Sequence, residues 1–188
     1  MEVNITYADT SNDQEILEQS ATAFARIAGA SNNDWSAAYH NTLCHIRSAD
    51  LLLKKDTGYA KAKYYTAIAA FKVADTLKPK DPENKILGIY LKIIELRFNK
   101  EKTRVNKIQQ IETEITEFRK VNPANPRILT INAYYYLILY STDKIKKAKA
   151  VELLNQAAKQ YALQKIEGFD PRWGKKWNTE LLQKTKSK

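Results

Sequence analysis

Apolar side chains recur every three or four positions along most of the chain, which is the spacing of one face of an α-helix. A clear example is the series Ile108, Ile111, Ile115 and Phe118. The pattern breaks at glycines, at polar turns and at two Pro-x-x-Pro junctions, and it favours no strand anywhere. It predicts about eight helices, at residues 13–28, 34–54, 59–77, 83–98, 104–121, 127–140, 145–164 and 171–184.

Four of the predicted helix starts recur at a spacing of 44 to 48 residues. Each places Asn or Asp before the first turn, where its side-chain oxygen can accept hydrogen bonds from free backbone N–H groups. Short loops between the helices imply antiparallel pairs, and each pair can complete its burial only against the next pair. The four starts are Asn33-Asp34-Trp35, Asp81-Pro82-Glu83, Asn125-Pro126-Arg127 and Asp170-Pro171-Arg172.

The repeat predicts an all-α fold in which residues 1–188 form a single helical-repeat domain. At this length one hydrophobic core is expected. The expected organisation is a flexible N-terminus at 1–12, a covering helix at 13–32, helix pairs at 33–80, 81–124 and 125–168, and a capping helix at 169–184.

The third helix resembles the second helix of the tetratricopeptide repeat, because Ala67, Phe71, Ala74 and Pro79 are spaced as in that motif. The same offsets recur at Ile111, Ile115, Phe118 and Pro123. The resemblance implies a right-handed solenoid of antiparallel helix pairs. The unit here is longer than the tetratricopeptide period of about 34 residues.

Longer segments resemble small Bacteroidota proteins with tetratricopeptide-like repeats, whose molecular activity is not assigned. The segments are 24–28, 35–39, 122–127 and 170–177. The resemblance implies a periplasmic or otherwise exported protein from which a signal has been removed. A cytoplasmic location is the alternative, and no apolar stretch approaches the length of a membrane span.

The chain has a net charge of +10 and would attract polyanions at low salt. Only 7 of its 31 basic residues are Arg, the residue best suited to binding phosphates, so we do not expect nucleic acid as a partner. Cys44 is the single cysteine, which excludes an internal disulfide. His40 and Cys44 share a helix face, but two further ligands are missing, and we expect no metal and no cofactor. The sequence also lacks phosphate-binding and catalytic motifs, so we expect no enzyme activity.

In tetratricopeptide proteins the first helix of each pair lines a groove that receives a peptide. The resemblance therefore implies a non-catalytic adaptor that binds a protein or peptide with acidic groups or a free carboxylate. The alternatives are a structural subunit of a cell-envelope assembly without a groove, and weak polyanion binding. The groove candidates are Ser36, His40, Lys85, Ile89, Lys92, Arg127, Thr130 and Tyr134.

The aromatic residues near the C-terminus suggest two further assignments. Tyr134 is a candidate surface aromatic, whereas Tyr136 and Tyr140 are expected to pack in the core. Trp173 and Trp177 lie one turn apart in the last predicted helix, where an aromatic pair can cap the apolar end of a solenoid.

Overall fold

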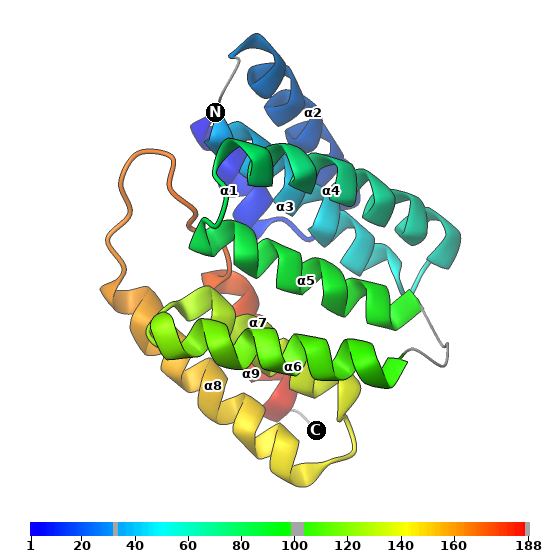
Figure 1. The fold of residues 1–188 in the computed structure, drawn as a ribbon, viewed down its shortest axis with the longest axis vertical. Helices are drawn as coiled ribbons and strands as arrows, with labels where there is room; N and C mark the ends of the chain where they lie inside the picture. The colour runs from blue at the N-terminus through cyan, green and yellow to red at the C-terminus, as the bar shows by residue number, and fades with distance from the viewer. Residues whose placement is uncertain (32–33, 99–103, 187–188) are drawn as a thin grey trace. The chain divides into compact units, whose positions relative to one another are not determined.

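The computed structural model describes residues 1–31, 34–98 and 104–186, and in these residues it contains nine α-helices and no strand (Figure 1). The all-α prediction is therefore confirmed for the described chain. The solenoid arrangement stays a prediction. The helices are α1 Glu2–Thr10, α2 Gln14–Ala30, α3 Trp35–Leu52, α4 Thr57–Leu77, α5 Pro82–Phe98, α6 Arg104–Val121, α7 Pro126–Leu139, α8 Lys144–Leu163 and α9 Lys175–Lys186.

The chain divides into two compact units, which are described separately. Unit 1 comprises Met1–Ile111 and Gly168–Pro171, and unit 2 comprises Glu112–Glu167 and Arg172–Lys188. The boundary falls inside α6. The single domain expected from the sequence, with its pair boundaries, stays a prediction.

Side-chain caps set most of the helix starts. Asp13 accepts from the backbone N–H groups of Glu15 and Ile16 at the start of α2, and Asn125 caps α7 in the same way, with Pro126 at the first helical position. Asp34, Asp56 and Asp143 cap α3, α4 and α8. These side chains satisfy N–H groups that have no partner within the helix, which is why polar residues before apolar runs located the starts so well.

Two expectations about the ends of the chain were wrong. The N-terminus, expected to be flexible, forms α1, because Ile5 and Ala8 are fully buried against Leu17 and Phe24 of α2. At the other end the helix begins at Lys175 rather than at residue 171. Gly174, with φ of 104°, is left-handed and separates the preceding turn from α9.

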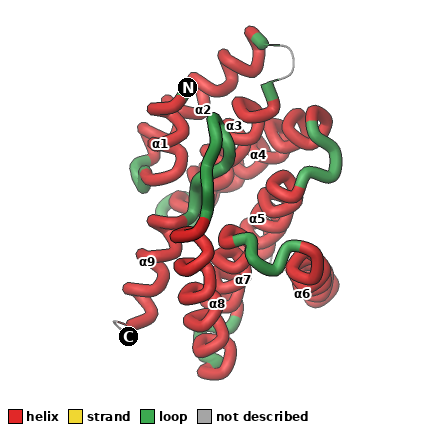
Figure 2. Tube along the Cα trace, turned by 90° about the vertical axis from the view of Figure 1, so that its left-hand side faces the viewer, coloured by secondary structure: helices red, strands yellow, loops and turns green. Residues whose placement is uncertain are grey.

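In unit 1, α3 is the central helix, with α1, α2, α4 and α5 all packed against it (Figure 2). Polar side chains tie α3 to α5: the Trp35 indole donates to Asn84, and the Tyr39 hydroxyl donates to Glu83. A helix that is contacted on several sides has little surface to offer a ligand. Eleven of the side chains of α3 are accordingly buried.

In unit 2, α8 packs against both α7 and α9. A buried network centres on Thr130, whose hydroxyl donates to Asn178 and lies 3.4 Å from the Tyr161 hydroxyl, while the Asn178 amide donates to the Leu154 carbonyl. A side chain at Gly174 would overlap the Tyr161 hydroxyl, so this close packing requires glycine.

No helix in the described ranges combines the length and the apolar character needed to cross a bilayer.

Candidate functional site

The groove candidates on α3 are held by internal contacts in unit 1. The Ser36 hydroxyl donates to the Phe169 carbonyl at 2.9 Å. His40 is 1% exposed, stacks on the Phe24 ring at 5.3 Å, and places Nε2 3.4 Å from the same carbonyl. His40 therefore fills the core, because the helix expected to line a groove is covered by α2.

On α5 the structure separates the two lysines from the apolar candidate. Ile89 is fully buried, whereas Lys85 is exposed and Lys92 is partly exposed. The partly open line of the helix runs through Lys85, Gly88 and Lys92, at helical offsets of three and four. The prediction that Ile89 lines a groove was therefore wrong, because the neighbouring Gly88, and not Ile89, lies on the same side of α5 as the two lysines.

On α7, in unit 2, all three candidates are buried. Arg127 is 4% exposed and donates to the Gln164 side chain, and Thr130 belongs to the buried network with Asn178. Tyr134 is 7% exposed and its ring centroid lies 4.8 Å from that of Trp177. The groove stripe expected on α7 is therefore core, since the first ten residues of the helix are buried all round.

The tryptophan pair expected to cap the fold packs in unit 2. Trp173 is 2% exposed, and its ring centroid lies 6.4 Å from that of the partly exposed Trp177. Trp173 precedes α9 and Trp177 lies in it, so they are not on one helix face as expected. Their role as a cap stays a prediction.

Aromatic rings reach the surface at the end of α7, where the sequence indicated core. The Tyr136 and Tyr140 rings are partly exposed, with centroids 6.2 Å apart. The Lys146 ammonium from the first turn of α8 lies 4.8 Å from the Tyr136 centroid and 5.0 Å from the Tyr140 centroid. Together with Tyr135 and Glu112 these residues form what we call the aromatic–lysine cluster.

Glu112 of α6 fixes two of the phenols in this cluster. Its Oε1 accepts from the Tyr135 hydroxyl at 3.2 Å and from the Tyr140 hydroxyl at 3.0 Å. Burial and the Glu112 carboxylate raise the pKa of both tyrosines. The phenols are therefore neutral at physiological pH, and their rings are held in position by hydrogen bonds at the outer edge.

The surroundings of the cluster are apolar and cationic. Leu137, Ile138 and Leu139 are partly exposed, and Lys144 and Lys147 flank Lys146 in the first turn of α8. Lysines at a helix N-terminus are unfavourable to the helix dipole, and the Asp143 carboxylate that caps α8 offsets part of this effect. Exposed aromatic rings beside an ammonium group suit a flat, apolar ligand that carries carboxylates.

The sequence contained a signal for this cluster. Tyr136 and Tyr140 are one helical turn apart, and the densest lysine run follows after a break of three residues. A helix hairpin with so short a turn brings the end of one helix next to the start of the other. The prediction that Tyr136 and Tyr140 pack in the core is wrong, because the end of α7 is partly exposed.

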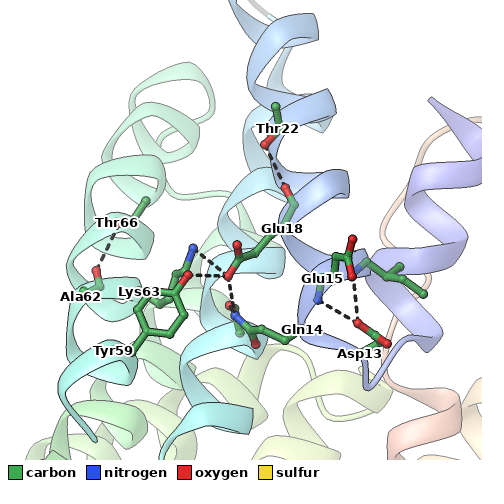
Figure 3. Close-up of polar contacts among 11 residues, drawn as sticks. Asp13, Gln14, Glu15, Glu18, Thr22, Tyr59, Ala62, Lys63 and Thr66 are labelled. Carbon is green, nitrogen blue, oxygen red and sulfur yellow. Dashed lines mark hydrogen bonds and ion pairs between the residues drawn. The ribbon is translucent and has the colours of Figure 1, made fainter. Parts of the chain in front are cut away.

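A second polar cluster lies in unit 1, between α2 and α4 (Figure 3). Glu18 Oε1 accepts from Gln14 at 2.8 Å, from the Tyr59 hydroxyl at 2.8 Å and from Lys63 at 3.0 Å. Nearby on α3, burial and the Lys63 charge lower the pKa of His45 to about 4. Because the Glu18 oxygen is satisfied by donors from two helices, this cluster serves as a connection between helices.

The described residues contain no group of three or more His, Cys, Asp or Glu side chains that could hold a metal ion. Cys44 is fully buried, and burial raises the pKa of its thiol to about 12. Neither Cys44 nor the buried His40 is presented to a ligand at the surface.

Comparison with known proteins gives one informative result. No protein-family model matches the sequence, and no curated protein shows a significant match. Among solved structures, the chain resembles the HusA haemophore from Porphyromonas gingivalis, with a TM-score of 0.76 and 22% sequence identity over 98% of this chain and 90% of that one. At this identity the likeness shows that the chain has the same all-helical fold as a protein from the Bacteroidota.

Proposed function

We propose that the chain is a non-catalytic binding protein whose ligand is a tetrapyrrole of the haem class. The observation that carries the proposal is the fold shared with a haemophore over 98% of the chain. Fold alone does not fix function, so the proposal also needs a surface with suitable chemistry. The aromatic–lysine cluster supplies one.

A tetrapyrrole such as haem is flat and apolar over its face and carries two carboxylates at one edge. The partly exposed rings of Tyr136 and Tyr140 offer π-faces for stacking. Lys146 places an ammonium group beside the two rings, where a charge-assisted hydrogen bond to a carboxylate can form, and Lys147 is partly exposed next to it in the sequence.

The side chains of the cluster favour contact with the macrocycle over coordination of its iron. Haem iron is usually held by His, Cys, Met or a Tyr phenolate. The cluster contains none of the first three, and the pKa of Tyr140 is raised, which disfavours the phenolate. The proposal therefore predicts similar binding of haem and of the corresponding metal-free porphyrin.

An absorbance titration with haemin and with protoporphyrin tests the site. Tyr136→Ala and Lys146→Gln should each weaken binding of both ligands by about tenfold, the size expected for loss of one stacking or charged contact. The matched controls are Tyr65→Ala and Lys72→Gln on α4, where both side chains are exposed in unit 1. Equal losses in site and control variants would place the ligand elsewhere, and absence of binding by the parent protein would overturn the function.

A peptide-binding adaptor is the alternative function, and the exposed Lys85 and partly exposed Lys92 are compatible with it. Competition with porphyrins distinguishes the two functions. If the chain binds a peptide in the groove, neither haemin nor protoporphyrin should displace that peptide from the parent protein. Lys85→Glu should then weaken binding of the peptide. The affinity for a ligand of the haem class should be unchanged in the Lys85→Glu variant. The envelope-subunit and polyanion alternatives predict no saturable porphyrin binding at all.

The proposal includes export from the cytoplasm, as the resemblance to small exported Bacteroidota proteins implies. A protein that captures a tetrapyrrole from the surroundings acts outside the cytoplasm. Cell fractionation of the source organism with an antibody against the chain tests this, and recovery only from the cytoplasm would contradict it.

A further inference from the structure

The positive charge of the chain is concentrated in unit 2. Unit 1 holds 16 basic and 14 acidic residues, a net charge of +2, whereas unit 2 holds 15 basic and 7 acidic residues, a net charge of +8. Unit 2 is also the smaller of the two. Even if every acidic side chain of unit 2 pairs with a different basic side chain of the unit, eight basic side chains remain.

Much of this excess lies on α8, whose basic residues are all lysines. The helix buries one side against α7 and α9 through Ala150, Leu153, Leu154, Ala157 and Tyr161. The opposite side carries a row of exposed residues at offsets of three and four, which we call the outer line of α8: Ile145, Lys149, Glu152, Gln156, Lys159 and Leu163.

The two ends of the outer line are aliphatic and strongly exposed. Ile145 is 80% exposed and Leu163 is 74% exposed. They are 18 residues apart, which is five helical turns or about 27 Å, so both point in the same direction from the helix. Exposed large aliphatic side chains that share a face with lysines are typical of surfaces that meet a lipid headgroup region.

We propose that the outer line of α8 docks unit 2 on an anionic lipid bilayer. The helix lies parallel to the surface, with Lys149 and Lys159 on the headgroups and the two aliphatic side chains inserted at the acyl boundary. Lys144 and Lys165, both exposed, add charge at the two ends, and Glu152 subtracts from it. The charge of unit 2 complements an anionic surface and decides between this occupant and a neutral apolar partner.

The aliphatic ends also separate a bilayer from a nucleic acid. Lysine attracts either polyanion, but a side chain such as Ile145 contributes to binding only where its surroundings are apolar. Loss of the aliphatic ends should therefore affect vesicles and leave a soluble polyanion such as heparin unaffected.

Vesicle co-sedimentation tests the proposal, with phosphatidylcholine vesicles that contain or lack phosphatidylglycerol. The full chain should bind only the anionic vesicles, and less as salt rises. Ile145→Asn combined with Leu163→Asn should lower the vesicle partition coefficient about tenfold or more with unchanged heparin affinity. Lys149→Glu combined with Lys159→Glu should lower binding to both vesicles and heparin by at least about tenfold.

The control variants carry the same changes in unit 1, at exposed positions of α4. Lys61→Glu combined with Lys72→Glu matches the charge change, and Val73→Asn, at a side chain 51% exposed, matches the loss of one of the two aliphatic side chains. These should change vesicle binding by less than about twofold. Circular dichroism verifies that each variant is folded.

Equal loss of vesicle binding in the charge variants of both units would overturn the proposal in favour of general attraction to polyanions. Full vesicle binding by the Ile145 and Leu163 variant would overturn the inserted geometry, and failure of the parent to bind anionic vesicles would overturn docking itself. None of these outcomes depends on whether the chain binds a tetrapyrrole.

Discussion

In unit 1, charged side chains join neighbouring helices, whereas unit 2 carries lysines well in excess of its acidic residues. Three ion pairs of unit 1 link α2 with α4, α3 with α5 and α5 with α6: Lys63–Glu18, Arg97–Asp50 and Lys107–Glu95. In unit 2 the Lys146 ammonium lies instead over two tyrosine rings. The contrast indicates that charges of unit 1 connect its helices, while unit 2 carries more basic side chains than its acidic residues can pair.

The cost of the two arrangements differs. An internal ion pair offsets part of the desolvation of both its members, and removal of one member leaves the other charge uncompensated. Excess like charge on one unit repels itself and lowers stability. An anionic ligand or surface would relieve this repulsion, so a unit with excess positive charge is a candidate binding region.

The largest effect is expected from the aromatic packing of unit 2. Trp173→Ala should lower the free energy of unfolding by about 3 to 5 kcal/mol, because the ring is buried and a cavity remains. Trp177→Ala should cost about half as much, since this ring is partly exposed. Denaturant midpoints measure both; if each variant stays within about 0.5 kcal/mol of the parent, the pair does not support unit 2.

The next effect tests the role of charge in unit 1. Asp50 accepts from the Tyr90 hydroxyl at 2.7 Å and pairs with Arg97. Asp50→Ala removes the carboxylate that both groups share and should cost about 2 to 4 kcal/mol. Asp75→Ala, at an exposed position of α4, is the control and should change stability by less than about 0.5 kcal/mol. Similar small losses for both would remove the contrast between the units.

Acid should destabilise unit 1 through His45. Its folded pKa is about 4 against an ordinary value of 6.5, so between these values the unfolded chain binds a proton that the folded chain excludes. Stability should therefore fall as pH falls from about 6.5 to about 4, by about 2 to 3 kcal/mol.

Glu18 adds a second effect at lower pH. Burial alone would raise the pKa of Glu18, but its hydrogen bonds to Gln14, Lys63 and Tyr59 lower it. The contribution of the Glu18 carboxylate to the free energy of unfolding is therefore lost as pH falls below its ordinary pKa of 4.5.

Both histidines lie in unit 1, so this window reports on that unit. Equilibrium unfolding at a series of pH values measures the effect. His45→Gln should flatten the profile between pH 6.5 and 4, and an unchanged slope in this variant would assign the dependence to other groups.

The smallest effect is expected at the proposed site. Lys146→Gln should change the free energy of unfolding by less than about 1 kcal/mol, because a partly exposed cation–π contact contributes little. Thermal or denaturant unfolding measures it. A loss as large as that of Asp50→Ala would show that Lys146 is a structural residue, and the binding surface would need another location.

The helices were largely predictable because their signals are local. Capping residues such as Asp34 and Asn125 hold their own helix starts, and apolar periodicity marks each body, so seven predicted starts lie within two residues of the structure. The helix α1 was missed because it has no side-chain cap and buries only Ile5 and Ala8. The start of α9 was misplaced because the left-handed Gly174 follows a Pro that resembled a helix start.

The site was harder to predict because exposure depends on neighbours that are distant in sequence. Periodicity places Tyr134 and Tyr136 on different faces of α7, but only the packing of Trp177 against Tyr134 decides which face is covered. The groove candidates follow from the resemblance to tetratricopeptide proteins, in which one side of the first helix of each pair is open to the groove. Here His40 and Thr130 are enclosed by other helices, which no local pattern indicates.

If the proposed function holds, the ligand binds unit 2 at the aromatic–lysine cluster and leaves the helices of unit 1 unaffected. Hydrogen exchange of backbone amides with and without protoporphyrin tests it most directly, because it locates the ligand without any substitution. We expect slower exchange at the end of α7 and the start of α8, across residues 136–150, and no change in α4 or α5. Slower exchange along residues 85–92 or 59–77, with residues 136–150 unaffected, would contradict it.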